Sequence, residues 1–171
     1  MAKIIIIRGN SASGKTSLAK AVQSQFPEKC IILSQDIIRR DLLGAHDGFD
    51  TPTITLLIHL IDFSYPKFNF IIIEGILRKD WYQPIWDHLL DNYQNDCQAY
   101  YYDLSFEETV KRHASRPKSN DFGQDALKKW WNDKDFLDLF NEQILSSELS
   151  IDEAKFQVLT KLIRLFVNCS G

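Results

Sequence analysis

The feature that most constrains the fold is the segment GNSASGKT at Gly9–Thr16, which directly follows the apolar run Ile4–Ile7. Four consecutive isoleucines fit a strand that is buried on both faces. A GxxxxGKT segment after such a strand predicts a phosphate-binding loop that leads into a helix. Gly9 permits the turn out of the strand, and Gly14 lets backbone N–H groups approach phosphate oxygens closely. The sequence therefore predicts a strand, a loop and a helix that together bind a triphosphate.

The side chains at the end of this loop predict how the triphosphate is held. Lys15 would reach the β- and γ-phosphates, which makes it a candidate catalytic residue, and Thr16 would offer its hydroxyl to Mg²⁺. An accidental turn rich in glycine and serine is the alternative interpretation. The residues expected to contact the nucleotide are Gly9, Asn10, Ser11, Ala12, Ser13, Gly14, Lys15, Thr16 and Ser17, with Arg112 from a later helix.

Composition and charge exclude several classes of protein. With 171 residues and 44% hydrophobic content, the chain can bury one sizeable core, so we expect one domain over residues 1–171. The net charge of −3 argues against extended nucleic-acid binding, because duplex-binding proteins use a broad basic surface. No stretch approaches the roughly 18 apolar residues that a membrane span requires. The spacing of Cys30, Cys97 and Cys169 fits free thiols in a cytoplasmic protein.

Apolar runs alternate with helical patterns along the chain. This alternation predicts an α/β protein in which helices cover both faces of a parallel sheet. The expected strands are Lys3 to Arg8, Cys30 to Leu33, Asn69 to Glu74 and Cys97 to Asp103, with a shorter one near Ile144 to Leu149.

Start and stop signals predict the helices between these strands. Gly44 ends the second helix, and the pair Thr51–Pro52 begins the third. Asp80 is expected to cap the fourth, and Ser105 with Glu108 forms a capping box for the fifth. The last helix is amphipathic, with Ile151, Ala154, Val158, Leu159, Leu162, Ile163 and Phe166 at helical spacing. The expected helices are Lys15 to about Gln25, Asp36 to Leu43, Thr51 to Pro66, Trp81 to Tyr93, Ser105 to about Ser115, and the C-terminal segment from Ile151.

Chemistry is expected beyond the carboxyl ends of the strands, where open α/β sheets bind their ligands. Asp36 follows the second strand and is the candidate general base, because a carboxylate there can accept the proton of a bound hydroxyl acceptor. The alternative role for Asp36 is a helix cap. Arg39 and Arg40 follow about one turn later and could clamp an anionic part of the acceptor. Because neighbouring arginines face different directions, we expect only Arg39 to touch substrate, and a solvated helix face is the alternative.

Glu74 ends the third predicted strand, beside the phosphate-binding loop. A carboxylate at this position could hold a Mg²⁺-bound water or orient the acceptor. Aspartate is the usual residue for the metal role, so a purely structural carboxylate at the end of the strand stays open as the third interpretation of Glu74.

Two arginines four residues apart predict a lid over the triphosphate. Arg112 and Arg116 share one helix face, and Pro117 forces the chain out of the helix directly after them. We expect a lid at about residues 112–130, in which Arg116 neutralises charge on the transferred phosphoryl group. The alternative is a helix laced by ion pairs, since Glu108 can pair with Arg112.

The segments GNSASGKTSLA, LSQDIIRRDLL, IIIEGIL and ETVKRHASRPKSNDFGQDALKKWW together resemble the small P-loop kinases of nucleosides, nucleotides and related hydroxyl acceptors. The pattern is most similar to the kinase domain of phage-type polynucleotide kinases, whereas EGIL at Glu74–Leu77 is more similar to uridine kinases. The resemblance implies that Asp36 is the base, Arg39 the acceptor clamp, and Arg112 and Arg116 lid arginines. It also implies a three-layer α/β/α fold with a five-stranded parallel sheet in the order 2-3-1-4-5 and a helical lid.

We therefore expect an ATP-dependent, Mg²⁺-requiring kinase that transfers the γ-phosphoryl group to a hydroxyl of a small-molecule acceptor, nucleoside-like or another alcohol. Residues 34–68 would form the helical region that binds this acceptor. Because the chain has a negative net charge, we expect a small alcohol rather than a polynucleotide 5′-hydroxyl as the phosphoryl acceptor.

Two further interpretations belong to other functional classes. A nucleotide-hydrolysing switch would use the same loop, but a GTPase would normally carry an NKxD segment, and NDKD at Asn132–Asp135 differs in order. The other interpretation is a nucleotide-binding module that has no catalytic activity. The intact set of Lys15, Thr16 and Asp36 weighs against it.

Overall fold

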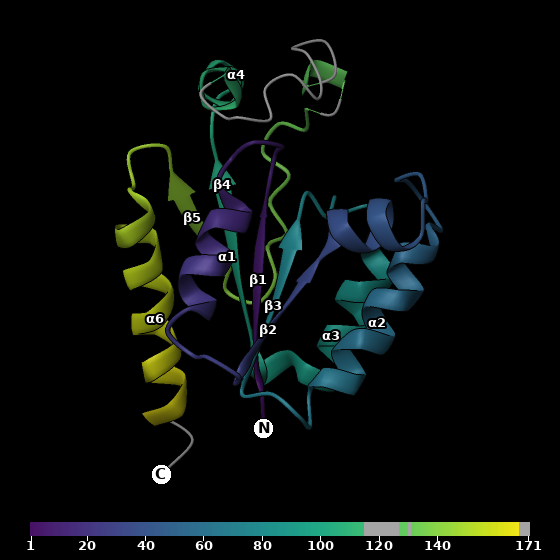
Figure 1. The fold of residues 1–171 in the computed structure, drawn as a ribbon, viewed down its shortest axis with the longest axis vertical. Coiled ribbons are helices and arrows are strands. Elements are labelled where there is room, and N and C mark those ends of the chain that lie inside the picture. The colour runs from purple at the N-terminus through teal and green to yellow at the C-terminus, as the bar shows by residue number, and fades with distance from the viewer. Residues whose placement is uncertain (115–126, 130, 168–171) are drawn as a thin grey trace.

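The structure is a computed structural model that describes residues 1–114, 127–129 and 131–167. Its strands form one sheet in the order β2-β3-β1-β4-β5, and each neighbouring pair is parallel (Figure 1). The predicted α/β fold and strand order are confirmed. The short strand β5 ends earlier than expected, because the chain turns after Ser146, where Leu149 N–H donates to the Ser146 carbonyl at 3.4 Å. The strands are β1 (Lys3–Gly9), β2 (Cys30–Ser34), β3 (Phe70–Gly75), β4 (Cys97–Asp103) and β5 (Gln143–Ser146).

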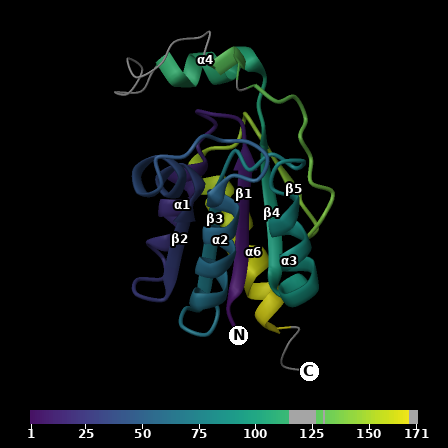
Figure 2. The same ribbon diagram turned by 90° about the vertical axis from the view of Figure 1, so that its right-hand side faces the viewer.

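The register of the strands brings their carboxyl ends together at one edge. Ile7 of β1 lies opposite Glu74 of β3, which in turn lies opposite Ser34 of β2. On the other side, Gly9 lies opposite Tyr102 of β4. The phosphate-binding loop and the residues that follow β2 and β3 therefore begin at neighbouring points (Figure 2).

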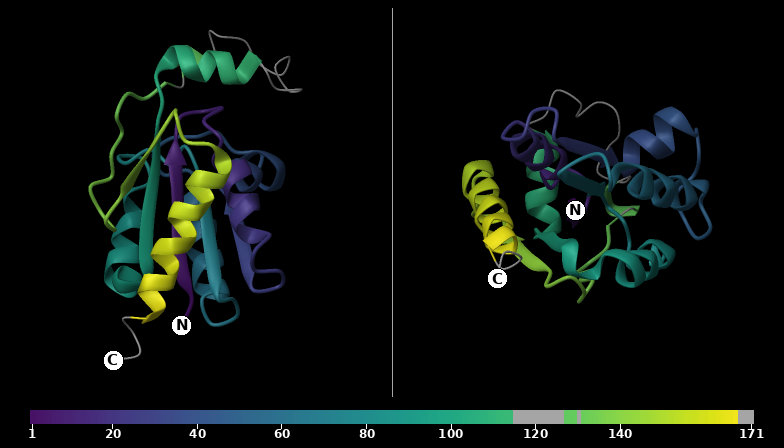
Figure 3. Two further views of the ribbon diagram at one scale, coloured as in Figure 1. Left: turned by 90° about the vertical axis from the view of Figure 1, so that its left-hand side faces the viewer. Right: turned by 90° about the horizontal axis from the view of Figure 1, so that it is seen from below.

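Helices cover both faces of the sheet, which makes three layers (Figures 1 and 3). The alternation of side chains along β1 sends Ile5 and Ile7 into a core with α1 and α6. Ile4 and Ile6 enter the opposite core, which α2 and α3 cover. No helix within the described ranges is long and apolar enough to cross a membrane. The helices are α1 (Lys15–Gln23), η1 (Ile37–Leu42), α2 (Pro52–Ser64), α3 (Gln83–Tyr93), η2 (Gln94–Asp96), α4 (Phe106–Ala114) and α6 (Ile151–Val167).

Capping boxes start the last two long helices. Ser105 Oγ accepts the N–H of Glu108 at 3.2 Å in α4, as predicted. In α6 both halves of the box form: Ser150 Oγ accepts the Glu153 N–H at 3.2 Å, and Glu153 Oε2 accepts the Ser150 N–H at 2.8 Å. The expected amphipathic face of α6 is confirmed at the buried residues Ala154, Val158 and Leu162, whereas the side chains of Ile163 and Phe166 lie outside the described part.

Two helices differ from their predicted form. The expected helix at Asp36 to Leu43 is a π-helix, in which Leu43 N–H donates to the carbonyl of Ile38 five residues back at 3.0 Å. Gly44, with φ +57°, ends it as predicted.

The fourth helix, α3, begins at Gln83, and Tyr82 occupies its N-cap position. The prediction that Asp80 caps this helix is therefore wrong. Asp80 Oδ1 instead accepts the N–H of Trp81 at 3.0 Å, so its carboxylate serves the turn before the helix.

A buried arginine fastens residues 131–142 to the start of the fold. Arg8 donates to the Asp135 carboxylate at 2.7 Å, to the Glu142 carboxylate at 3.1 Å and to the Leu77 carbonyl at 3.0 Å. Its side chain is fully buried, so both acidic partners balance a charge that water cannot reach. The guanidinium carbon lies 5.5 Å from the ring of Trp86 and 5.6 Å from that of Tyr101.

The cysteines behave as structural residues where they are described. Cys30 and Cys97 are free and buried. Burial raises the pKa of both thiols to about 12, so they stay protonated at neutral pH. This confirms the expected free thiols for these two residues, whereas Cys169 lies outside the described residues.

Candidate active site

The loop between β1 and α1 requires glycine at two positions. Gly9 has φ +138°, and a Cβ there would lie 3.0 Å from both the Cβ and the carbonyl oxygen of Tyr102. Gly14 has φ +108° and is the N-cap residue of α1. Side chains rarely allow either conformation. The loop can therefore hold its backbone close to β4 and aim it at the N-terminus of α1, where helix dipole and free N–H groups favour an anion.

Lys15 crosses the phosphate-binding loop from its end to its beginning. Its Nζ donates to the carbonyl of Asn10 at 2.7 Å and to Ser13 Oγ at 3.3 Å. The residue is only 8% exposed. Its ammonium charge is therefore held inside the loop, where it can pair with phosphate oxygens.

The side chain of Asn10 has a structural role that its position in the GxxxxGKT motif does not predict. Its amide nitrogen donates to the carbonyl of Asn132 at 2.7 Å, and its amide oxygen accepts the Asn132 N–H at 2.9 Å. Asn10 was predicted to contact the nucleotide. The side chain instead clamps the phosphate-binding loop to residues 131–135, so only its backbone N–H remains for the predicted contact.

Arg112 and Tyr102 flank the loop on the side of β4. Arg112 donates to the carbonyl of Ser13 at 3.1 Å, to that of Ser147 at 2.8 Å and to Glu108 Oε1 at 2.9 Å. Arg112 therefore forms the ion pair within α4 that was the alternative interpretation, and its guanidinium group also lies on the phosphate-binding loop, whereas its contact with the nucleotide stays a prediction. Sequence reasoning missed Tyr102, whose ring lies 3.9 Å from the position of a Cβ on Gly14.

Glu74 lies directly beside the hydroxyl that was predicted to bind Mg²⁺. Its Oε2 accepts from Thr16 Oγ1 at 3.2 Å, and its Oε1 accepts from Ser34 Oγ at 2.5 Å. The residue is 3% exposed. A buried carboxylate next to a hydroxyl and the phosphate-binding loop is a donor set that suits Mg²⁺ bound through waters and phosphate oxygens. These contacts favour the metal role over a purely structural one.

Glu74→Gln tests this role, because it keeps the shape of the side chain and removes its charge. We expect the Mg²⁺ concentration for half-maximal binding of an ATP analogue to rise about 10- to 100-fold. Isothermal titration calorimetry at fixed Mg²⁺ concentrations measures it. The control is Ser34→Ala, which removes one hydrogen bond but leaves the carboxylate. An equal Mg²⁺ dependence in wild type and Glu74→Gln would assign Glu74 to the structural role.

The residues after β2 form a small charged cluster. Asp36 Oδ1 accepts from Arg39 Nη2 at 3.0 Å and pairs with Arg40 Nε at 3.3 Å. The capping alternative for Asp36 is not seen in the described segment Ile37–Leu42. The side chain of Asp36 is 53% exposed, and its Oδ2 has no partner among the described residues. The carboxylate is thus oriented by two cations, with one oxygen open.

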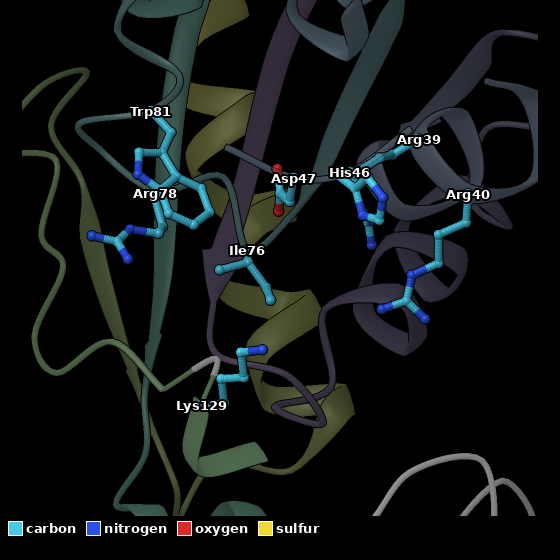
Figure 4. Close-up of a pocket in the computed structure, with 8 residues that line it drawn as sticks. All are labelled: Arg39, Arg40, His46, Asp47, Ile76, Arg78, Trp81 and Lys129. Atoms are coloured by element: carbon cyan, nitrogen blue, oxygen red, sulfur yellow. The ribbon is translucent and has the colours of Figure 1, made fainter. Parts of the chain in front are cut away.

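A cavity of about 490 Å³ lies beside this cluster, beyond the ends of β2 and β3 (Figure 4). Arg39 and Arg40 both contribute to its wall, and the expectation that only Arg39 touches substrate stays a prediction. The wider turn of the π-helix reduces the angle between successive side chains and brings both arginines to one side. The lining residues are Arg39, Arg40, His46, Asp47, Ile76, Arg78, Trp81 and Lys129.

Asp47 is held rigidly at this cavity by neutral donors. Its Oδ1 accepts from Tyr82 Oη at 2.6 Å and from the Gly48 N–H at 3.2 Å, and its Oδ2 accepts from Gln35 Nε2 at 3.1 Å. Burial and the bond to Asp47 raise the pKa of Tyr82, so it remains a donor at neutral pH. Sequence reasoning missed this network, because its members are separated by up to 47 residues.

Several predicted site residues cannot be placed. Arg116 and most of the expected lid at 112–130 lie outside the described residues. Within the described part, no three histidine, cysteine or acidic side chains are grouped so that they could hold a metal ion by themselves. Trp131, which follows the lid, packs edge-to-face on Phe106 with ring centroids 5.4 Å apart.

A glycine-rich loop between a buried strand and a helix, ending in lysine and threonine, defines a P-loop nucleotide-binding fold in this five-stranded sheet. The sequence model of one family, described as an AAA domain, matches residues 4–134. The chain belongs to this family. A comparison with curated protein sequences finds no match.

Solved structures of P-loop kinases share the fold. A gluconokinase from Sinorhizobium meliloti superposes with a TM-score of 0.65 at 15% identity, covering 98% of this chain and 95% of that one. APS kinase from Mycobacterium tuberculosis, in complex with AMPPNP and APS, gives 0.67 at 18% identity, with 94% and 97% coverage. A Pnkp1/Rnl/Hen1 RNA repair complex matches over 75% of this chain and 42% of that one, with a TM-score of 0.54 and 18% identity. The predicted resemblance to small P-loop kinases is thus confirmed at the level of the fold.

Proposed function

We propose that this protein is an ATP-dependent kinase that transfers the γ-phosphoryl group to a hydroxyl of a small-molecule acceptor. One observation carries the proposal: the phosphate-binding loop and a cavity of about 490 Å³ open at the same edge of one sheet. A volume of this size suits a small molecule. A triphosphate on the loop and an alcohol in the cavity can therefore lie next to each other, as phosphoryl transfer requires.

The donor half of the site consists of the loop, Lys15, Thr16 and Glu74. Lys15 offers a buried positive charge to the phosphates. Thr16 and Glu74 are joined by a hydrogen bond and would together hold Mg²⁺. When bound, Mg²⁺ neutralises charge on the phosphate oxygens, which favours attack by the acceptor. Arg112 adds a further cation at the same loop.

Asp36 is the residue we propose to receive the acceptor hydroxyl. Arg39 and Arg40 hold its Oδ1. The other oxygen remains available to accept a hydrogen bond from the hydroxyl and to take its proton as the new phosphate ester forms. Because the transition state of phosphoryl transfer is loose, orientation of the hydroxyl is a large part of this role.

Asp36→Asn is expected to lower the turnover of phosphoryl transfer by about 10²-fold, because the amide can orient a hydroxyl but cannot take its proton. The binding of ADP should persist, which calorimetry checks. Asp41→Asn is the matched control, since Asp41 is an exposed aspartate in the π-helix that follows Asp36 and, unlike Asp36, forms no ion pair with Arg39 or Arg40 in the described structure. Wild-type turnover in Asp36→Asn would remove this residue from the chemistry.

A transfer screen with radiolabelled ATP tests the proposed activity directly. The acceptors are nucleosides, nucleotides, sugars, sugar acids, aminoglycosides and oligonucleotides with a free 5′-hydroxyl, and Asp36→Asn is the control. We expect labelled product from at least one small alcohol. Labelled inorganic phosphate as the only product would contradict the proposal and support a hydrolytic switch.

A polynucleotide 5′-hydroxyl kinase is the second candidate within the same chemistry. The likeness to an RNA repair complex that contains Pnkp1 favours it. The net charge of −3 and the size of the cavity favour a small acceptor. Similar folds in a gluconokinase and in an APS kinase complexed with APS point in the same direction. We also propose that the chain acts as one domain and in the cytoplasm, where free thiols are stable.

The contacts of Asn132–Asp135 weigh against a switch that reads a guanine base. Asn132 is clamped to Asn10 through its backbone, and Asp135 accepts from Arg8 and from the Lys79 N–H. These residues therefore fasten the chain to the sheet, so that the segment NDKD has a structural explanation.

A further inference from the structure

The cavity concentrates positive charge in a chain that is acidic as a whole. Four of its lining residues are cations, and Asp47 is its one carboxylate among the described lining residues. The whole chain carries a net charge of −3. Asp36 and Asp80 lie close by and pair with three of the four cations, which reduces but does not cancel the local excess. The four cations are Arg39, Arg40, Arg78 and Lys129.

Lys129 is the cation that the fold leaves most available. It is exposed, and within the described part of the chain it has no ion-pair or hydrogen-bond partner. Figure 4 shows its ammonium group turned toward the part of the cavity that His46 and Arg40 border from another element. Lys129 lies at the end of the predicted lid, whereas the arginines follow β2. Cations from two distant segments thus meet at one cavity, where an anion between them could pair with both.

Arg39 has a hydrogen-bond donor to spare. Its Nη1 donates to the Ala45 carbonyl at 3.1 Å and its Nη2 to Asp36. The Nε atom is buried and has no acceptor among the described residues. A buried donor without an acceptor is unfavourable, because it has lost its hydrogen bonds to water and gained none in the protein. A small turn of the guanidinium group toward an anion in the cavity would supply the missing acceptor.

Asp47 does not accept a hydrogen bond from Arg39 Nε. Its two carboxylate oxygens instead accept hydrogen bonds from the neutral donors Tyr82, Gly48 and Gln35. A carboxylate has about four lone-pair sites, and the three hydrogen bonds that Asp47 accepts use three of them. One site therefore remains for a hydroxyl group of a bound molecule. The cavity thus offers cations for an anion and a fixed carboxylate for an alcohol.

We propose that the acceptor is a small alcohol that carries a carboxylate, sulfate or phosphate group, and that Lys129, Arg39 and Arg40 bind this anion. The inference rests on the proposed kinase function and names the chemical class of its acceptor. Asp47 binds a hydroxyl of the same molecule. Charge-assisted hydrogen bonds make such an acceptor bind better than a neutral alcohol of the same size.

The test compares matched acceptors that differ in the anion alone. The first pair is gluconate and sorbitol, and the second is glycerol 3-phosphate and glycerol, so that the two pairs separate a carboxylate site from a phosphate site. Binding is measured by calorimetry on the full chain saturated with ADP and Mg²⁺, which keeps the anions off the phosphate-binding loop. Transfer is measured with radiolabelled ATP on the same four compounds. We expect about 10- to 100-fold tighter binding of at least one anionic member.

Lys129→Gln tests the cation that has no ion-pair or hydrogen-bond partner among the described residues. We expect it to weaken binding of the preferred anion about 10-fold or more, and Lys129→Arg should restore most of the affinity because it keeps the charge. Lys128→Gln is the matched control: it removes the same charge from the neighbouring residue, which does not line the cavity. Equal losses in Lys128→Gln and Lys129→Gln would show a general charge effect and overturn the assigned site.

The outcomes separate this inference from the proposed function. Transfer to sorbitol or glycerol at least as efficient as to the anions would overturn the anionic acceptor and leave the kinase in place. Transfer to water alone would overturn the kinase, and the binding comparison would still decide the anion site. Equal binding of anionic and neutral members, unchanged in Lys129→Gln, would overturn the anion site whatever the transfer result.

Discussion

Lys15→Met is expected to lower phosphoryl transfer by about 10³-fold, to water as well as to any alcohol, because it removes the buried cation that we propose to pair with the transferred group. The ammonium of Lys15 is held inside the loop by Asn10 and Ser13, at 2.7 and 3.3 Å. Methionine has a similar length and packs where the aliphatic stem of lysine lay. The readout is the release of labelled phosphate or product from radiolabelled ATP.

The matched control is Lys20→Met, which removes a lysine from the last turn of the same helix α1. We expect wild-type turnover from it. A comparable loss in both variants would mean that the charge of α1 matters in general, and wild-type turnover in Lys15→Met would refute the assignment of the loop as the phosphoryl donor site.

Arg8→Met is expected to lower the free energy of unfolding by about 3–5 kcal/mol, the usual range when one partner of a buried ion pair is removed. The change leaves the carboxylates of Asp135 and Glu142 largely buried without their shared cation. Urea denaturation followed by circular dichroism measures the loss. Lys155→Met, which breaks the ion pair with Asp152 on α6, should change stability by less than about 1 kcal/mol.

A combined variant separates stranded charge from lost packing. Arg8→Met together with Asp135→Asn and Glu142→Gln removes all three charges and keeps the side-chain sizes close to the original. We expect it to regain part of the lost stability, because no buried carboxylate is left without a partner. Stability as low as in Arg8→Met alone would mean that the lost hydrogen bonds and ring contacts of Arg8 account for the effect.

The parts of the site that the sequence predicts well are those whose cause is local or set by the sheet. The phosphate-binding loop is contiguous, and its glycines have the left-handed backbone that the motif implies. Glu74 lies close to Thr16 because the parallel strands end at one edge of the sheet. The place of Glu74 at the end of an apolar run was therefore enough to predict that it lies beside the phosphate-binding loop. Asp36 and Arg39 are three residues apart and meet within one helical turn.

The parts that the sequence does not predict depend on partners far along the chain. In the sequence, Arg8 is an ordinary polar residue before a glycine. No neighbouring residue indicates that its side chain pairs with Asp135 and Glu142. The side chain of Asn10 reads as part of a phosphate motif, yet it binds Asn132. The π-helix cannot be recognised from the sequence either, because its six residues are too few to reveal a hydrophobic period.

The clamp between Asn10 and Asn132 has a consequence for the order in which the protein is completed. The partners are 122 residues apart, and those of Arg8 are 127 and 134 residues away. During synthesis the glycine-rich loop leaves the ribosome 122 residues before Asn132, to which it is bound in the folded protein. Closing so long a loop must also precede these bonds during refolding. Nucleotide affinity should therefore be a late event of folding, although the residues that define the motif are made well before the residues that hold them in place.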